Sequence, residues 1–327
     1  MRIFGRTVPL WATFFPLALA VGGYWRWWDG RMSVFRADLG AVLGPGMAAD
    51  FGGFPYRLHA EAGHLVLMRA REDVSVQLEA ERMTVDRQPA ATALSVIGMA
   101  APKLRIEVAG NAGAVTEIAA PSGRASVHAD YGRLTRLSAE FPDAHVALGI
   151  LPGAIEAARL EVHVRETPVA PIALPTGPAM PVQAQVRLAG EGVRMDGGDP
   201  LGMEADIAVT AASPLRSAKG WAAQSGTVEL RRLRLADKGG VVAEVAATVV
   251  PRGGVLEMAG TVTTVCPRAV LAALAHRVPG APEYRARVAQ RIAFGGVAGA
   301  VTAKVDEAKL GAWTVRAQEA ACPVLRR

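Results

Sequence analysis

Apolar and polar residues alternate with a period of two along much of the chain. The alternation is clearest in residues 160–164, and it recurs in residues 74–78 and 104–108. Successive side chains of a strand point to opposite faces of a sheet, so this pattern predicts half-buried antiparallel strands. Similar segments recur from residue 57 to residue 265. The sequence therefore predicts a mainly β fold: a long curved antiparallel sheet with a few helices.

Two departures from the alternation predict where strands bend and turn. Val228 and Leu230 change phase before Leu233 and Leu235, across a pair of arginines, as a β-bulge would require. Residues 251–254 separate two apolar segments and predict a four-residue hairpin loop.

Prolines interrupt the alternation in residues 168–181. This stretch is interpreted in two ways, which the pattern alone does not separate. It is a boundary between a first β region, residues 51–167, and a second β region with C-terminal helices, residues 182–327, or it is an extended edge that crosses a single domain.

Helical spacing replaces the two-residue period near the C-terminus. Residues 267–278 begin with a proline suited to a first helical turn, and their apolar residues recur at helical intervals. A second helix is expected over residues 282–294, because Tyr284, Val288 and Ile292 would share one face. Its arginines are interpreted as solvated surface residues or as contacts to anionic lipid headgroups.

The N-terminal segment has a different character. Residues 8–25 carry no charge and are preceded by Arg2 and Arg6. A stretch of this length reaches most of a ~30 Å hydrocarbon core, and tryptophans near its ends favour the membrane interface. The segment is therefore predicted to be a transmembrane anchor over residues 8–28. The alternative is a cleaved signal peptide, because residues 18–20 have the small-x-small pattern of a cleavage site.

The two N-terminal arginines also predict an orientation. Residues 1–7 are expected in the cytoplasm, since basic residues flank the cytoplasmic side of a membrane segment. Residues 29–50 are expected to form a helical connector, with a helix over residues 32–43. The expectation is a single-pass inner-membrane protein with a large periplasmic domain.

Composition narrows the classes of function. The 327 residues are 51% hydrophobic and 20% charged, which is typical of a chain that folds around a core and excludes a disordered polymer. The net charge of +6 is spread along the chain without a basic cluster. Nucleic acid is therefore not an expected partner.

The sequence carries no recognisable catalytic motif. It has no nucleophile elbow, phosphate-binding loop or dinucleotide fingerprint. His59 and His64 flank Glu61 but lack the spacing of a metal motif, so they are interpreted as strand and turn positions. We expect no enzyme activity, no metal and no cofactor. An exported hydrolase is kept as the third functional hypothesis.

The chain has two cysteines, Cys266 and Cys322. Both would lie in the exported part, where an even number of cysteines favours a disulfide. The alternative is that each is a small buried residue.

One pair of motifs resembles a known family. The segments Gly53-Phe54-Pro55-Tyr56-Arg57-Leu58 and 80–89 are similar to domain of unknown function 2125, a family of membrane-anchored exported proteins in alphaproteobacteria. The resemblance implies an N-terminal anchor and a β-rich chain, but no activity. It singles out Gly53, Phe54, Pro55, Arg57, Arg87 and Pro89. Phe54 is expected to pack under the first strand, and Arg57 to pair with an acidic neighbour.

A ligand is suggested by strands that are apolar on both faces, such as residues 64–68 and 241–245. The leading hypothesis is that the curved sheet binds an apolar or lipid ligand, with Val245 and Leu256 on its inner face, at the surface of a lipid bilayer. The layout also resembles AsmA-like envelope proteins. A second buried layer would explain the same pattern. The competing function is a structural or interaction module that binds another envelope protein by strand addition.

Overall fold

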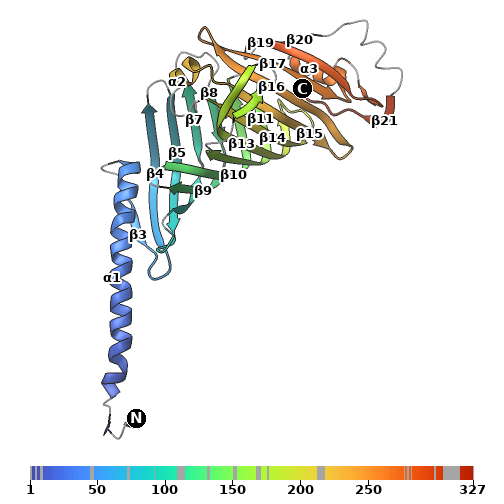
Figure 1. Cartoon of the computed structure of the whole chain (residues 1–327). Coiled ribbons are helices and arrows are strands. Elements are labelled where there is room, and N and C mark those ends of the chain that lie inside the picture. The colour runs from blue at the N-terminus through green and yellow to red at the C-terminus, as the bar shows by residue number, and fades with distance from the viewer. Residues whose placement is uncertain are drawn as a thin grey trace.

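The computed structural model shows a long curved antiparallel sheet with a helical arm at one end (Figure 1). The mainly β fold predicted from the sequence is confirmed. The structure describes residues 2–3, 6–7, 10–44, 48–71, 74–91, 93–108, 115–130, 133–149, 153–166, 171–174, 177–211, 218–275, 277, 280, 282–297, 300–304 and 317–326.

The large sheet is built from strands that are all antiparallel to their neighbours. In chain order they are β3 (Asp50–Gly52), β4 (Leu58–Arg71), β5 (Val74–Arg87), β6 (Leu94–Ala100), β7 (Lys103–Val108), β8 (Val115–Ala119), β9 (Ser122–Asp130), β10 (Arg133–Leu148), β11 (Ala154–Glu166), β12 (Pro171–Leu174), β13 (Gly177–Met195), β14 (Leu201–Thr210), β15 (Val228–Asp237), β16 (Gly240–Arg252), β17 (Val255–Thr264), β19 (Gln290–Val297) and β20 (Ala300–Lys304). The three predicted segments of strict alternation lie in β5, β7 and β11.

The strands follow one another across the sheet from β3 to β20. Between β5 and β10, however, two short strands lie end to end at each place where one long strand would be expected. β5 pairs Arg82 with Ala100 of β6 and Glu79 with Lys103 of β7, in one continuous register. β9 and β8 share β10 in the same way. β6–β7 and β9–β8 are therefore two long strands, each interrupted once.

These interruptions belong to a line that crosses the sheet from β4 to β13, which we call the crease. Along an ordinary strand, the residues that face the core are two positions apart. At this line they are three positions apart, so a strand whose even-numbered residues are buried on one side of the line has its odd-numbered residues buried on the other side, or the reverse. The buried pairs are Ala62 and Leu65 in β4, Ala80 and Met83 in β5, Phe141 and Ala144 in β10, Ala157 and Leu160 in β11, and Gly190 and Val193 in β13. The two interrupted strands break on the same line, at Ala101–Pro102 and Ala120–Pro121.

The crease resembles a row of aligned β-bulges. A single bulge inserts one residue against a straight partner and shifts the pairing. At the crease, neighbouring strands each contain the extra residue at the same level. β4 and β5 therefore keep one pairing register on both sides of the crease. The backbone adopts positive φ at Ala101 (47°), Asp143 (45°) and Gly192 (61°), all on this line.

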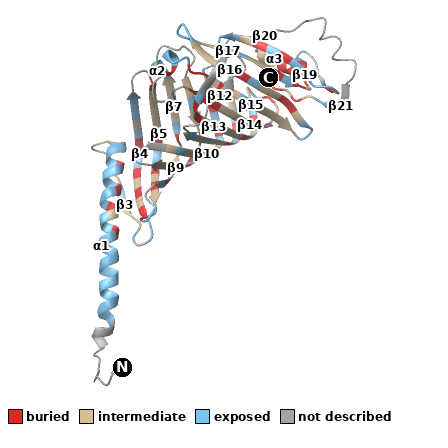
Figure 2. Ribbon diagram, in the orientation of Figure 1, coloured by how far each residue is buried: buried red, intermediate tan, exposed pale blue. Residues whose placement is uncertain are grey.

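One face of the sheet is apolar along its length. Ile97 and Met99 pack against two buried clusters, one at the β4–β5 end and one at the centre. Met203 continues the central cluster on β14, and Leu201 of the same strand belongs to the cluster at the far end. Figure 2 shows buried positions distributed along the whole sheet.

α1 (Leu10–Leu43) covers the apolar face at the β4–β5 end. Its residues Trp28, Met32, Phe35 and Leu39 recur every four or three positions, so they form one buried stripe. The anchor and connector helices predicted separately are thus parts of one continuous helix.

The N-terminal part of α1 extends beyond the sheet (Figure 1). Phe14, Phe15, Leu17, Leu19 and Val21 are between 55% and 61% exposed. Among the described residues, no helix combines the length and apolar character needed to cross a membrane. The single-pass anchor therefore stays a prediction.

At the other end of the sheet, α3 (Pro267–Leu274) and the C-terminal tail cover the apolar face. Cys266 and Cys322 form a disulfide with a Cα–Cα distance of 5.8 Å, which is one of the two alternatives that the sequence left open. Leu325 is buried in the same cluster, and Val324 exchanges backbone and side-chain hydrogen bonds with Asp199. α2 (Ala218–Ala223) places Trp221 in a smaller cluster.

Two small two-stranded sheets complete the described structure. β1 (Arg2–Ile3) pairs with β2 (Arg6–Thr7), and β18 (Tyr284–Ala286) pairs with β21 (Ala317–Ala321).

The predicted second C-terminal helix is wrong. Residues 284–286 and 290–297 are strands β18 and β19. Ile292 and Phe294 are buried while Arg291 and Ala293 are exposed, which is the two-residue period of a strand. The helical spacing of Tyr284, Val288 and Ile292 was coincidental.

The structure confirms the predicted bulge and shortens the predicted hairpin loop. The bulge predicted in residues 228–235 is confirmed by register shifts of β15 against both of its neighbours. The hairpin at residue 251 has two loop residues, Gly253 and Gly254, because the strands continue through Pro251 and Arg252. Both glycines have positive φ, as a tight type I′ turn requires.

The Pro-rich stretch does not interrupt the large sheet. Its described residues form β12 and the first part of β13, which pair with each other. Next to them, β13 also pairs directly with β11. The sheet is therefore continuous from the first predicted β region to the second.

Candidate functional site

The Gly53–Arg57 motif forms a tight turn between β3 and β4. The backbone N–H groups of Tyr56 and Arg57 both donate to the Gly53 carbonyl, at 3.2 and 3.0 Å. Gly53 has φ +101°, and a Cβ there would lie 2.5 Å from the Arg57 carbonyl oxygen. Glycine is therefore required at this position. The Phe54–Pro55 peptide bond is cis.

This turn contacts α1 through hydrogen bonds and aromatic rings. The Tyr24 hydroxyl donates to the Pro55 carbonyl at 2.5 Å, and the Trp28 indole N–H donates to the Arg57 carbonyl at 3.3 Å. The rings of Phe54 and Trp28 meet edge to face, with centroids 5.3 Å apart. The expectation that Phe54 packs under the first strand is wrong: it packs against α1 and is 46% exposed.

Arg57 finds the acidic neighbour that the sequence led us to expect. Its guanidinium lies 3.4 Å from Asp86, whose carboxylate also lies 2.9 Å from His59 Nδ1. Since His59 and Asp86 are cross-strand partners, this pair joins the turn to the start of the sheet.

Arg87 is the second contact between the sheet and α1. It donates to the carboxylate of Asp38 at 2.7 Å and to the Ser95 hydroxyl at 3.0 Å. Its guanidinium also lies 5.1 Å from the centre of the Phe35 ring. The side chain is 14% exposed, so Arg87 is enclosed between α1 and β6. Pro89 is buried just after β5 ends.

The junction of α1 with the sheet therefore contains five of the six motif residues: Gly53, Phe54, Pro55, Arg57 and Arg87. Their partners on the helix were missed by sequence reasoning, namely Tyr24, Trp28, Phe35 and Asp38. The four-three-four spacing from Trp28 to Leu39 was the available signal, because it predicts an apolar stripe that must be covered.

The central part of the apolar face lies away from this junction. Its cluster is built only from strands and strand connections, whereas the clusters at the two ends include residues of α1 and α3. We call its partly buried side chains the central apolar stretch: Ile118, Leu137, Leu148, Ile155, Val162 and Met203. Within the described residues, no helix covers it.

Val245 and Leu256, predicted to contact a ligand, are not together. Both are partly buried, but Val245 packs against the cluster under α3 and Leu256 against the cluster of Trp221. Neither belongs to the central apolar stretch.

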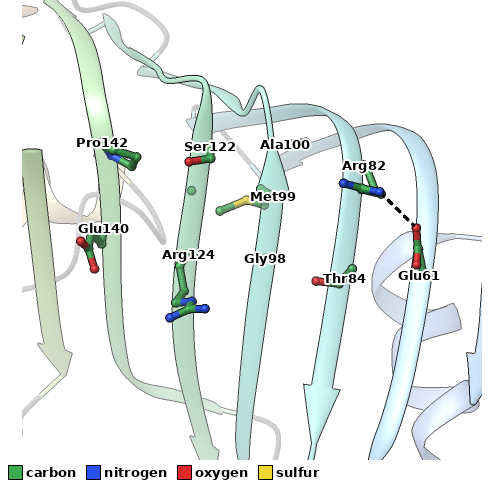
Figure 3. A pocket seen from close by; sticks show the side chains of 11 residues that line it. Glu61, Arg82, Thr84, Gly98, Met99, Ala100, Ser122, Arg124, Glu140 and Pro142 are labelled. Atoms are coloured by element: carbon green, nitrogen blue, oxygen red, sulfur yellow. Dashed lines mark ion pairs between the residues drawn. The ribbon is translucent and has the colours of Figure 1, made fainter. Parts of the chain in front are cut away.

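Two hollows on the opposite, polar face flank the crease. One has a volume of about 530 Å³ and is lined by charged side chains that include Glu61, Arg82, Arg124 and Glu140 (Figure 3). The other, of about 450 Å³, is lined in part by Glu79, Lys103, Glu117 and His145.

Charges on the polar face are largely neutralised by neighbours. Glu61 lies 3.9 Å from Arg82, and Glu140 lies 2.8 Å from Arg159. Arg159 also contacts Glu161 at 2.6 Å. Such exposed ion pairs contribute little to stability. They do mean that each of these carboxylates already has an arginine as its partner. Among the described residues, no group of three histidines, cysteines or carboxylates could hold a metal ion.

Comparison with known proteins returned no match: no protein-family model, curated protein or solved structure is similar to this chain. The resemblance to domain of unknown function 2125 thus stays a prediction.

Proposed function

We propose that this protein is attached to a lipid bilayer through α1 and binds an apolar or lipid ligand on its curved sheet. The observation that carries the proposal is the central apolar stretch. A soluble sheet ordinarily covers its apolar face with a helix or a second sheet. Within the described residues, the clusters at the two ends include helix residues and the cluster between them does not, so the ligand is proposed to bind over these partly buried side chains.

Attachment is supported by the arm. Phe14 to Trp27 extend over about 20 Å at the helical rise of 1.5 Å per residue, and this part of α1 exposes large apolar side chains. An exposed apolar segment of this size favours lipid over water. Arg2 and Arg6 precede it in the sequence and would be attracted to anionic headgroups.

The inner membrane of a diderm cell, with the sheet in the periplasm, is the proposed location. The disulfide between Cys266 and Cys322 supports it, because disulfides persist in oxidising compartments. A C-terminal alkaline phosphatase fusion would be active in this orientation, and an inactive fusion would contradict it.

The ligand hypothesis is tested with a pair of matched substitutions. Val162→Gln places an amide in the central apolar stretch, while Val96→Gln makes the same change at a 39% exposed position of β6. Val96 lies opposite Asp86 on the polar face. We expect Val162→Gln to lower the amount of lipid that co-purifies, measured by mass spectrometry of gently purified protein. Val96→Gln should leave it unchanged.

Thermal unfolding of both variants separates binding from folding. Equal lipid content in wild type and Val162→Gln, with similar melting temperatures, would contradict a ligand on this face. Protein that carries no lipid at all, when purified without detergent, would contradict it as well.

A protein partner is the second candidate, and a free strand edge favours it. Within the part of the chain that the structure describes, β3 pairs with residues 59–61 of β4. Among the described strands, none pairs with residues 62–71 of β4 on that side, and Val66 and Met68 there are 48% and 62% exposed. An open edge of this length can accept a strand from another protein.

A further inference from the structure

Exposed aromatic side chains gather where α1 leaves the sheet. Tyr24, Trp25 and Trp27 of α1 are 40%, 52% and 41% exposed, and Phe54 and Tyr56 of the motif turn are 46% and 85% exposed. The ring of Tyr24 lies 5.5 Å from that of Trp27 and 6.1 Å from that of Phe54, between centroids. We call these five residues the aromatic collar.

The aromatic collar separates two zones of α1. On its N-terminal side lie the exposed apolar residues from Phe14 to Val21, and on its C-terminal side lies the stripe buried against the sheet. The order along the helix axis is therefore apolar, then aromatic, then packed protein. Tryptophan and tyrosine are enriched at this level in membrane proteins, because their rings are apolar and their N–H and O–H groups remain hydrated.

Positive charge accompanies the aromatic collar. Arg26 lies between Trp25 and Trp27 on α1, and Arg31 lies one turn later, with its guanidinium 5.8 Å from the centre of the Trp27 ring. Arg57 of the turn is also exposed, at 59%, and its charge is balanced by Asp86 at 3.4 Å. The carboxylates nearby are Asp29 on α1 and Asp86, and Asp86 is already paired with Arg57 and His59.

We propose that the aromatic collar is a membrane-contact surface that lies in the headgroup layer of an anionic bilayer. The inference rests on the proposed attachment through α1, and adds that the sheet itself touches lipid through the Phe54–Tyr56 turn. Because Tyr24 and Trp28 hold this turn to α1, the two contacts are fixed relative to each other. The bilayer would therefore hold the sheet in one orientation.

Tyr56 is the residue that tests this inference. Its side chain is 85% exposed, and the turn depends on its backbone N–H, so Tyr56→Ser should leave the fold intact. Tyr284→Ser is the matched control, because Tyr284 is 55% exposed in β18 at the far end of the sheet. The measurement is flotation of the full chain with vesicles of phosphatidylcholine and phosphatidylglycerol.

We expect Tyr56→Ser to lower the vesicle partition coefficient about five-fold, which corresponds to partial burial of one aromatic ring. Tyr284→Ser should have no effect, and Tyr56→Trp should restore wild-type partitioning. Vesicles of phosphatidylcholine alone should bind the wild type more weakly.

The outcomes distinguish this inference from the function on which it rests. If the wild type does not float, attachment through α1 fails and the aromatic collar fails with it. If it floats and the two serine variants behave alike, attachment stands and the collar is overturned. If binding does not change when phosphatidylglycerol is removed, the assignment of anionic headgroups is overturned.

Discussion

At the scale of single residues, the motif turn shows how a local requirement positions a much larger element. Gly53 lets the chain reverse in front of β4, and the carbonyls exposed by that reversal accept hydrogen bonds from Tyr24 and Trp28. Arg87 completes the junction from β5, where it is the cross-strand partner of Leu58, the residue that follows the turn. The turn therefore acts as the docking site for α1.

Substitution of Gly53 by alanine tests the turn. We expect Gly53→Ala to lower the free energy of unfolding by about 2 kcal/mol or more, because the new Cβ meets a backbone carbonyl at a positive φ. Gly52→Ala is the control, since a Cβ there has no atom within 4 Å. Denaturant unfolding of the two variants gives the comparison, and equal midpoints would contradict a strict glycine requirement.

The sequence singled out these residues, but it did not predict that they contact α1. Glycine and proline signal a turn through their own backbone preferences, which are local. The contact of Arg87 with Asp38 joins residues 49 positions apart, and no period along the chain encodes such a pairing. The junction could be recognised as important from the sequence, but its partner could not.

At the scale of elements, strands were predicted well and the C-terminal helices only in part. Residues 160–164 alternate strictly because one face of β11 is solvated. β19 is short and contains two glycines, so a few apolar residues satisfied a helical spacing by chance. Tertiary pairing with β17 and β20 decides its structure.

α3 depends on a residue outside its own sequence. The Glu283 carboxylate accepts hydrogen bonds from the backbone N–H groups of Arg268 and Ala269, at 2.9 and 2.8 Å, in the first turn of α3. We expect Glu283→Ala to destabilise the protein by about 1 kcal/mol, because these N–H groups lose a charged acceptor.

A matched change elsewhere provides the control for Glu283. Glu204→Ala removes a carboxylate that is 72% exposed and lies 4.0 Å from Arg234, so its effect should stay within about 0.5 kcal/mol. Chemical denaturation of both variants distinguishes the two roles. An equal effect would mean that Glu283 does not cap α3.

At the scale of the whole molecule, the apolar face of the sheet is covered by helices at both ends. α1 covers one end, while α3 and the tail cover the other. The disulfide joins positions 56 residues apart and holds β21 close to the start of α3. Curvature and the crease could not be predicted, because they depend on how neighbouring strands align.

Removal of the disulfide should loosen the far end. We expect the double variant Cys266→Ala, Cys322→Ala to lose up to about 4 kcal/mol of stability, because the unfolded chain regains the freedom of the open loop. The wild type in reductant should unfold at a similar midpoint. If thiol labelling of denatured, unreduced wild type modifies two cysteines per chain, the bond is absent in solution.

The crease has a consequence for how this chain tolerates insertions and deletions. In an ordinary sheet, losing one residue from a strand turns half of that strand's side chains inside out. At the crease, successive strands all contain the extra residue at the same level. Neighbouring strands therefore keep one pairing register on both sides of the crease. Deleting Asp143 alone would remove the extra residue from β10 while its neighbours keep theirs. The side chains of β10 on one side of the crease would then change faces, and charged positions would point into the core. The strands around the crease can therefore change length at that line only in concert, so the sheet behaves there as one indivisible unit.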